Sequence, residues 1–172
     1  MKNIVLTGFM GTGKSSVGRR LAKELGLRFV DMDAVIEKDA GVKIKAIFAG
    51  RGEAHFRRLE KETIGKLVSG AFGDGLVVAA GGGAVVNNEN RAALRKWAAL
   101  VCLTASVDVL FRRVTANDDR PLLSVEDKKT EIEKIFSQRQ EAYKDCDLTV
   151  DTSSIGIDDV VAEIERFWGK KG

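Results

Sequence analysis

The chain has 172 residues, which is the size of one ordinary domain and enough to bury a substantial core. Apolar residues make up 44% and charged residues 31%, a composition typical of a globular protein with little long disorder. The net charge of +3 is small and spread along the sequence, so neither nucleic acid nor a membrane is predicted as a partner. The two cysteines lack disulfide-framework or metal-ligand spacing, and no apolar run reaches membrane-spanning length, so a cytoplasmic protein is expected.

Apolar runs that predict strands alternate with helical patterns along the whole chain. The runs are short and continuous, as in strands buried on both faces, and they cover residues 3–7, 28–30, 76–80, 99–103 and 148–150. The first helical pattern places Val17, Leu21 and Leu25 on one face, and Gly26 follows as a C-terminal cap. This alternation predicts a single α/β domain over residues 1–172, with a parallel sheet and helices on both of its faces.

A phosphate-binding loop is predicted between the first strand and the first helix. Residues 8–15 (GFMGTGKS) match the pattern Gly, any four residues, Gly, Lys and then Ser or Thr. In such a loop the glycines let backbone N–H groups turn toward phosphate oxygens, and the following helix aims its positive end at the same anion. The Lys14 side chain can reach the β- and γ-phosphates of ATP, and the Ser15 hydroxyl can ligate Mg²⁺. The predicted nucleotide contacts in this segment are Gly11, Thr12, Gly13, Lys14, Ser15 and Ser16.

The carboxylates that phosphoryl transfer requires are predicted after the second strand. No acid follows the third strand, which ends in Gly81, whereas Asp31 and Asp33 come directly after the second. Residues i and i+2 of an extended chain point the same way, so both carboxylates are expected to face one cleft. Asp31 would then organise the metal and Asp33 would accept a proton from an acceptor hydroxyl. The alternative is that Asp33 only caps the next helix.

Several arginines are candidates for binding anions. Arg57 lies on a predicted helix three residues before Glu60, so from spacing alone a surface ion pair is the favoured interpretation. Arg139 shares a helical stripe with apolar residues that should face inward, which favours a functional role. Arg113 ends another helical pattern, and spacing leaves open whether it is solvated, interacts with the helix dipole or contacts nucleotide.

The only proline marks a candidate lid. It follows Arg120 in an irregular segment, and a lid at about residues 115–125 would bring this cation over the phosphates on closure. The residues alone therefore predict a P-loop kinase that uses ATP and Mg²⁺ to phosphorylate a small hydroxylated, anionic acceptor.

Six motifs, in order along the chain, resemble those of the shikimate kinases. The phosphate loop has the family's aromatic-Met-Gly interior, and Asp31-Met32-Asp33 is similar to its Asp-x-Asp motif. The other four are Phe-Arg-x-x-Glu at residues 56–60, the triple-glycine turn at 81–83, Arg-Pro-Leu-Leu at 120–123 and Arg-x-x-x-Tyr at 139–143. Together they cover nearly the whole chain. Ala80, before the glycines, departs from the larger or hydroxyl-bearing residue of many members.

The resemblance implies transfer of phosphate from ATP to the 3-hydroxyl of shikimate, a step of aromatic amino-acid biosynthesis. It also implies a three-layer fold with a five-stranded parallel sheet in the order 2-3-1-4-5 and a mobile lid. The implied roles of single residues follow the motifs: Asp33 as base and hydroxyl ligand, Arg57 and Arg139 on the carboxylate, Gly82 and Gly83 at the acceptor, Ser15 and Asp31 for the metal, Lys14 and Arg120 on the transferring phosphate, and Arg113 near adenine.

Two other kinds of protein contain such a phosphate loop, other small-molecule kinases and nucleotide-dependent switches. A gluconate or nucleoside monophosphate kinase would share the fold but lacks the combination of triple glycine and paired arginines. A nucleotide-dependent switch would want a guanine-recognition signature of the Asn-Lys-x-Asp type, which the sequence lacks. No apolar surface stripe predicts a partner subunit, so the expected state is a monomer that binds small molecules.

Overall fold

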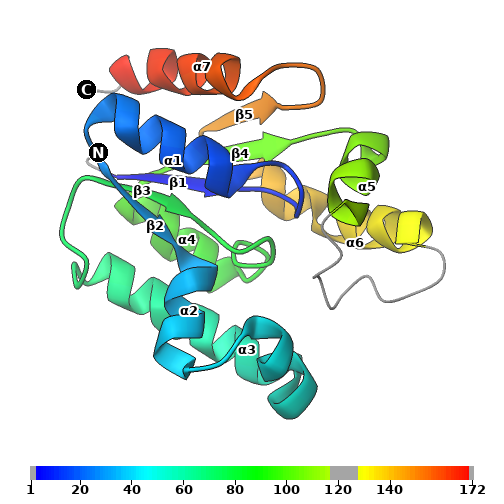
Figure 1. The fold of residues 1–172 in the computed structure, drawn as a ribbon. Helices are drawn as coiled ribbons and strands as arrows, with labels where there is room; N and C mark the ends of the chain where they lie inside the picture. The colour runs from blue at the N-terminus through cyan, green and yellow to red at the C-terminus, as the bar shows by residue number, and fades with distance from the viewer. Residues whose placement is uncertain (1–2, 117–127, 171–172) are drawn as a thin grey trace.

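A five-stranded parallel sheet forms the centre of the molecule (Figure 1). In this computed structural model, which describes residues 3–116 and 128–170, the strand order is β2-β3-β1-β4-β5, as the family resemblance implies. The strands are β1 (Ile4–Thr7), β2 (Arg28–Asp31), β3 (Leu76–Ala79), β4 (Ala99–Thr104) and β5 (Leu148–Asp151). Each boundary lies within one residue of the prediction.

The strands differ in burial according to their place in the sheet. Strands β1 and β3 are buried along their whole length, and β4 is buried except at its last residue. The edge strands β2 and β5 are partly exposed, so the prediction of strands buried on both faces is wrong for these two. An edge strand has a neighbour on only one side, and its side chains are covered by fewer helices.

Helices cover both faces of the sheet, as predicted. On one face lie α1 (Lys14–Leu25) and α7 (Ile157–Gly169), which pack against each other. On the other face lie parts of α3 (Ile44–Val68), α4 (Asn88–Trp97) and α6 (Lys128–Lys144), with α5 (Val107–Thr115) packed on α6. The short α2 (Met32–Ala40) packs against α3 beyond the edge of the sheet.

Three buried clusters hold these layers together. One joins α1 and α7 to the sheet through residues such as Leu21 and Ile164, and a second joins the sheet to α3, α4, α5 and α6. The third is small and lies between α2 and the first half of α3, around Ile36 and Phe56. Helix α3 bends at Gly52, where φ is 74°. Helix α2 and the first half of α3 thus share a small core of their own, whereas the second half of α3 packs into the cluster shared with the sheet.

The candidate lid at residues 115–125 lies almost entirely outside the described residues, as does Arg120. Within the described part of the chain, no helix is both long and apolar enough to cross a membrane.

Candidate active site

The phosphate loop connects β1 to α1 at the carboxyl edge of the sheet. Gly8 adopts a φ of 128°, and a Cβ atom there would lie 2.0 Å from the carbonyl oxygen of Leu103, so only glycine fits. At the other end of the loop, Gly13 has a φ of 92° and precedes the first helical residue, Lys14. The strand-loop-helix context that the motif requires is therefore present.

Two polar side chains at the start of α1 point in different directions. The Lys14 ammonium donates to the carbonyl oxygens of Gly8 and Phe9, at 2.9 and 2.8 Å, and so lies over the loop. The Ser15 hydroxyl donates to Asp31 Oδ2 at 2.7 Å, which joins the loop to the end of β2. A hydroxyl and a carboxylate at this distance are the hard oxygen donors that Mg²⁺ prefers.

The two acids at the end of β2 and the start of α2 are oriented differently from the sequence prediction. Asp31 ends the strand and is itself the cap of α2, because its Oδ1 accepts from the backbone N–H of Asp33 at 3.1 Å. Asp33 is already in the first turn of that helix, so the expectation of two side chains aligned on one extended strand is wrong. The alternative in which Asp33 caps the helix is wrong as well. Both acids nevertheless line one cavity.

This first cavity has a volume of about 420 Å³ and runs along the phosphate loop. Beside the loop, the Arg113 guanidinium donates to the carbonyl of Gly11 at 3.4 Å and to the side chain and the carbonyl of Thr152, at 2.9 and 2.7 Å. Arg113 thereby ties α5 to the segment that follows β5. Ile155 and Ile157, both partly exposed, add an apolar wall. A cavity lined by both a polar loop and apolar side chains suits the phosphates and the base of a nucleotide.

A second, smaller cavity of about 80 Å³ opens beside the first. Both cavities are lined by Asp33, Gly81 and Gly82, so this aspartate stands where they meet. Arg57, Gly83 and Arg139 line only the second cavity, together with aromatic and aliphatic side chains of α3. The structure thus brings together all the predicted acceptor-site residues.

Arg57 is more than the surface ion pair that spacing favoured. Its guanidinium bonds to Glu53 at 2.8 Å and to Glu60 at 3.0 Å, and it packs so closely on Gly83 that a Cβ atom there would lie 2.3 Å from Nη1. Its side chain is 30% exposed, whereas that of Glu60 is only 1% exposed. The pair is therefore half-buried at the cavity rather than solvated.

Glu60, predicted as the ion-pair partner of Arg57 and as the last residue of the Phe-Arg-x-x-Glu motif, also lines the second cavity. Burial raises the pKa of Glu60, and the Arg57 guanidinium offsets this only in part. Its Oε1 atom has no hydrogen-bond partner among the residues that the structure describes. A signal was available: Glu60 shares a helical stripe with the buried Phe56, Ile64 and Leu67, the argument that favoured Arg139.

A nucleotide loop that opens into a second, cation-lined cavity defines a P-loop kinase that phosphorylates a small molecule. The protein-family model described as shikimate kinase matches residues 10–168. A shikimate kinase of Geobacter metallireducens is 46% identical over 97% of this chain and 92% of its own length, and one of Caldanaerobacter subterraneus is 41% identical over 99% and 98%. A solved structure of shikimate kinase from Acinetobacter baumannii in complex with shikimate is 33% identical, with a TM-score of 0.93 over 99% of this chain and 94% of that one. The chain therefore belongs to the shikimate kinase family.

Proposed function

We propose that this chain transfers the γ-phosphoryl group of ATP to the 3-hydroxyl of shikimate, in the route to the aromatic amino acids. The observation that carries the proposal is the meeting of two cavities at Asp33, Gly81 and Gly82. One cavity contains the phosphate loop, and the other contains two arginines on its wall. A donor phosphate and an anionic acceptor bound on either side of Asp33 would have their reacting groups next to each other.

On the nucleotide side, we propose that the backbone of Gly11, Thr12 and Gly13, with Ser16, surrounds the phosphates and that Arg113 lies near adenine. Lys14 would leave the loop carbonyls to contact the β- and γ-phosphates. The Ser15 hydroxyl and the Asp31 carboxylate fit Mg²⁺, which when bound would neutralise charge on the phosphate oxygens. Few protein ligands are needed because phosphate oxygens and water complete the shell of this ion.

On the acceptor side, we propose that Arg57 and Arg139 bind the carboxylate of shikimate. Arg57 is preset for this role, since Glu53 and Glu60 hold its guanidinium at the cavity wall. Asp33 would bind the hydroxyls and accept the proton that the attacking oxygen loses. Gly82 and Gly83 would contact the ring through the backbone, since glycine has no side chain. At Gly83 a side chain would also occupy the place of the Arg57 guanidinium.

Arg120 completes the proposal as the cation of a lid over the transferring phosphate. It lies outside the described residues, and its role rests on the irregular segment around the only proline and on the Arg-Pro-Leu-Leu motif. A cytoplasmic monomer remains the expectation from the sequence.

The proposal is tested by measuring ADP release with shikimate, gluconate and a set of nucleoside monophosphates as acceptors. We expect turnover only with shikimate, together with a dependence on Mg²⁺. Turnover with another acceptor and none with shikimate would contradict the assignment, and a gluconate or nucleoside monophosphate kinase would then be the better description.

A further inference from the structure

The loop between β3 and α4, residues 80–87, carries the triple glycine and is fastened at two points to helix α6. The first link is direct: the buried Tyr143 hydroxyl of α6 donates to the carbonyl oxygen of Gly82. Burial raises the pKa of Tyr143 to about 12, with the Arg139 guanidinium acting in the opposite direction, so the hydroxyl stays protonated and can donate at neutral pH.

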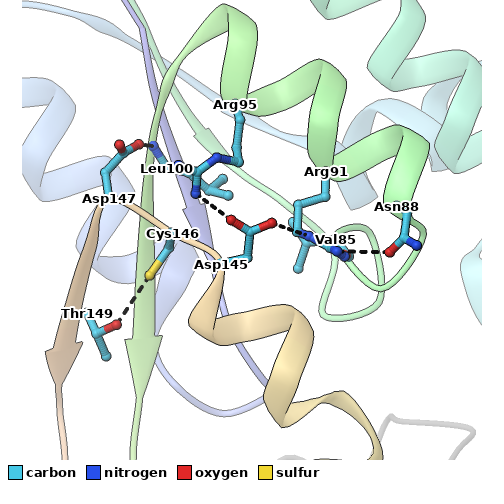
Figure 2. A network of polar contacts seen from close by, with 9 residues as sticks. All are labelled: Val85, Asn88, Arg91, Arg95, Leu100, Asp145, Cys146, Asp147 and Thr149. Atoms are coloured by element: carbon cyan, nitrogen blue, oxygen red, sulfur yellow. Dashed lines mark hydrogen bonds and ion pairs between the residues drawn. The ribbon is translucent and has the colours of Figure 1, made fainter.

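The second link runs through Arg91 of α4 (Figure 2). This side chain is only 17% exposed and uses three nitrogens: Nη1 donates to the carbonyl of Val85 at 2.7 Å, Nη2 to Asn88 at 2.8 Å and Nε to Asp145 at 2.8 Å. Val85 belongs to the triple-glycine loop, whereas Asp145 directly follows α6. Arg91 therefore joins the loop to the end of the helix that bears Arg139.

Asp145 is itself held firmly. Its second carboxylate oxygen accepts from Arg95 at 2.7 Å, so two arginines of α4 contact one carboxylate. Two residues later, Asp147 exchanges two bonds of 2.8 Å with the backbone of Leu100 at the start of β4. Figure 2 shows these contacts in a row between α4, the end of α6 and the sheet. Asp145 is thus held by several contacts, and through Arg91 it holds the triple-glycine loop in a defined orientation.

These links bear on the acceptor because the two walls they join face one cavity. Gly82 and Gly83 form one wall and Arg139 belongs to the other. Asp145 lies six residues after Arg139, or about 9 Å along the helix axis. A small shift of the loop relative to α6 would therefore change the spacing between the glycine backbone and this guanidinium, although neither Arg91 nor Asp145 lines the cavity.

We propose that Tyr143 and the Arg91–Asp145 ion pair are positioning residues that set the spacing of the acceptor site and thereby the affinity for shikimate. The inference rests on the proposed function. It predicts a specific kinetic pattern: weaker binding of the acceptor, with nucleotide binding and the chemical step little affected. A purely structural role would instead lower the melting temperature and the fraction of active enzyme, without changing the KM for shikimate.

The experiment compares Asp145→Asn, Tyr143→Phe and the double variant with the wild type. Each single change should raise the KM for shikimate about three- to tenfold and leave kcat and the KM for ATP within about twofold. Tyr143→Phe removes the donor to Gly82, and Asp145→Asn removes the charge and one of the two oxygens that accept from Arg91 and Arg95. Because each link still restrains the loop in part when the other is lost, the double variant should lose more than the product of the single effects. Asp145→Glu, which keeps the charge, should recover part of the loss.

Glu141→Gln is the matched control. Glu141 is also an acid near the end of α6, but its ion pair is with Lys144 of the same helix, and its side chain is 84% exposed. This variant should have wild-type kinetics. If Asp145→Asn and Tyr143→Phe also keep the wild-type KM for shikimate, or if the KM for ATP rises equally, the inference is wrong while the proposed function stands. If the wild type does not phosphorylate shikimate at all, both fall together.

Discussion

Replacing Gly83 by alanine would test how closely the acceptor site is packed around Arg57. A Cβ atom at this position would lie 2.3 Å from Arg57 Nη1, 2.7 Å from Nη2 and 2.8 Å from Cζ. Ordinary contacts begin near 3.4 Å, so the guanidinium has to retreat by about 1 Å. Because it is the far end of a flexible side chain, it can do so without unfolding the protein.

The cost of this retreat should appear in the binding of shikimate. A displacement of about 1 Å at a group that positions substrate can reduce the reaction rate by up to about a hundredfold. Movement of Arg57 also disturbs its bonds to Glu60 and Glu53, at 3.0 and 2.8 Å. We expect Gly83→Ala to raise the KM for shikimate at least about tenfold, which corresponds to about 1.4 kcal/mol. The KM for ATP should change little, because Gly83 does not line the larger cavity.

Steady-state kinetics with each substrate varied in turn would measure this effect, and thermal unfolding would report on stability. Gly65→Ala is the control, since Gly65 lies in the same helix as Arg57 and an added Cβ atom has nothing within 4 Å. Alanine there should keep the kinetics and stabilise the helix by up to about 1 kcal/mol. A Gly83→Ala enzyme with the wild-type KM for shikimate would refute the reasoning, because Arg57 would then not need its present position.

Three further predictions concern other parts of the site and a pair of thiols. Asp33→Asn should retain ATP binding, measured by calorimetry, while kcat falls by about 10²- to 10⁴-fold through loss of the base; unimpaired turnover would remove Asp33 from that role. Ser15→Ala removes the hydroxyl that bonds Asp31 at 2.7 Å, so a titration of activity with Mg²⁺ should need a higher concentration for half-maximal rate; an unchanged titration would exclude Ser15 as a ligand. A hydrogen bond from Cys102 lowers the pKa of the half-buried Cys146 thiol to about 6, whereas the same pairing and burial raise the pKa of Cys102. Alkylation by iodoacetamide should therefore be selective for Cys146 and fall as the pH drops through about 6, and Cys102→Ala should move this midpoint upward; equal labelling of both thiols would contradict the pairing.

Local patterns in the sequence were sufficient to predict the positions of the strands and the phosphate loop. Five short apolar runs predicted the strands to within one residue. Burial between two layers of helices explains the continuous apolar runs of β1, β3 and β4, whereas β2 and β5 are partly exposed at the edges of the sheet. The loop was predictable because eight consecutive residues carry all of its backbone geometry. The strand order came from the family resemblance, since periodicity does not say which strands are adjacent.

The second cavity could be assembled only by the fold. Arg57 and Glu60 are three residues apart, and such pairs on a helix are usually solvated; what buries this one is the approach of Gly83 from a loop that is distant in sequence. The orientations of Asp31 and Asp33 also could not be predicted from the sequence. Their identity was readable, but the strand ended at Asp31 and a helix began there, so the directions of the side chains followed from the turn rather than from the strand period.

The sequence by itself was enough to predict a phosphate-binding loop at residues 8–15, because contiguous residues form that loop. Only the tertiary structure decided where the acceptor chemistry lies, since Asp33, Arg57, Gly82 and Arg139 come from four separate segments. Asp33 and Gly82 come to one edge of the sheet because they follow parallel strands, and α3 and α6 pack so that Arg57 and Arg139 line the same cavity. The links from Tyr143 and Asp145 to the triple-glycine loop likewise could be seen only in the tertiary structure, because hydrogen bonds between distant segments form only when the layers have packed.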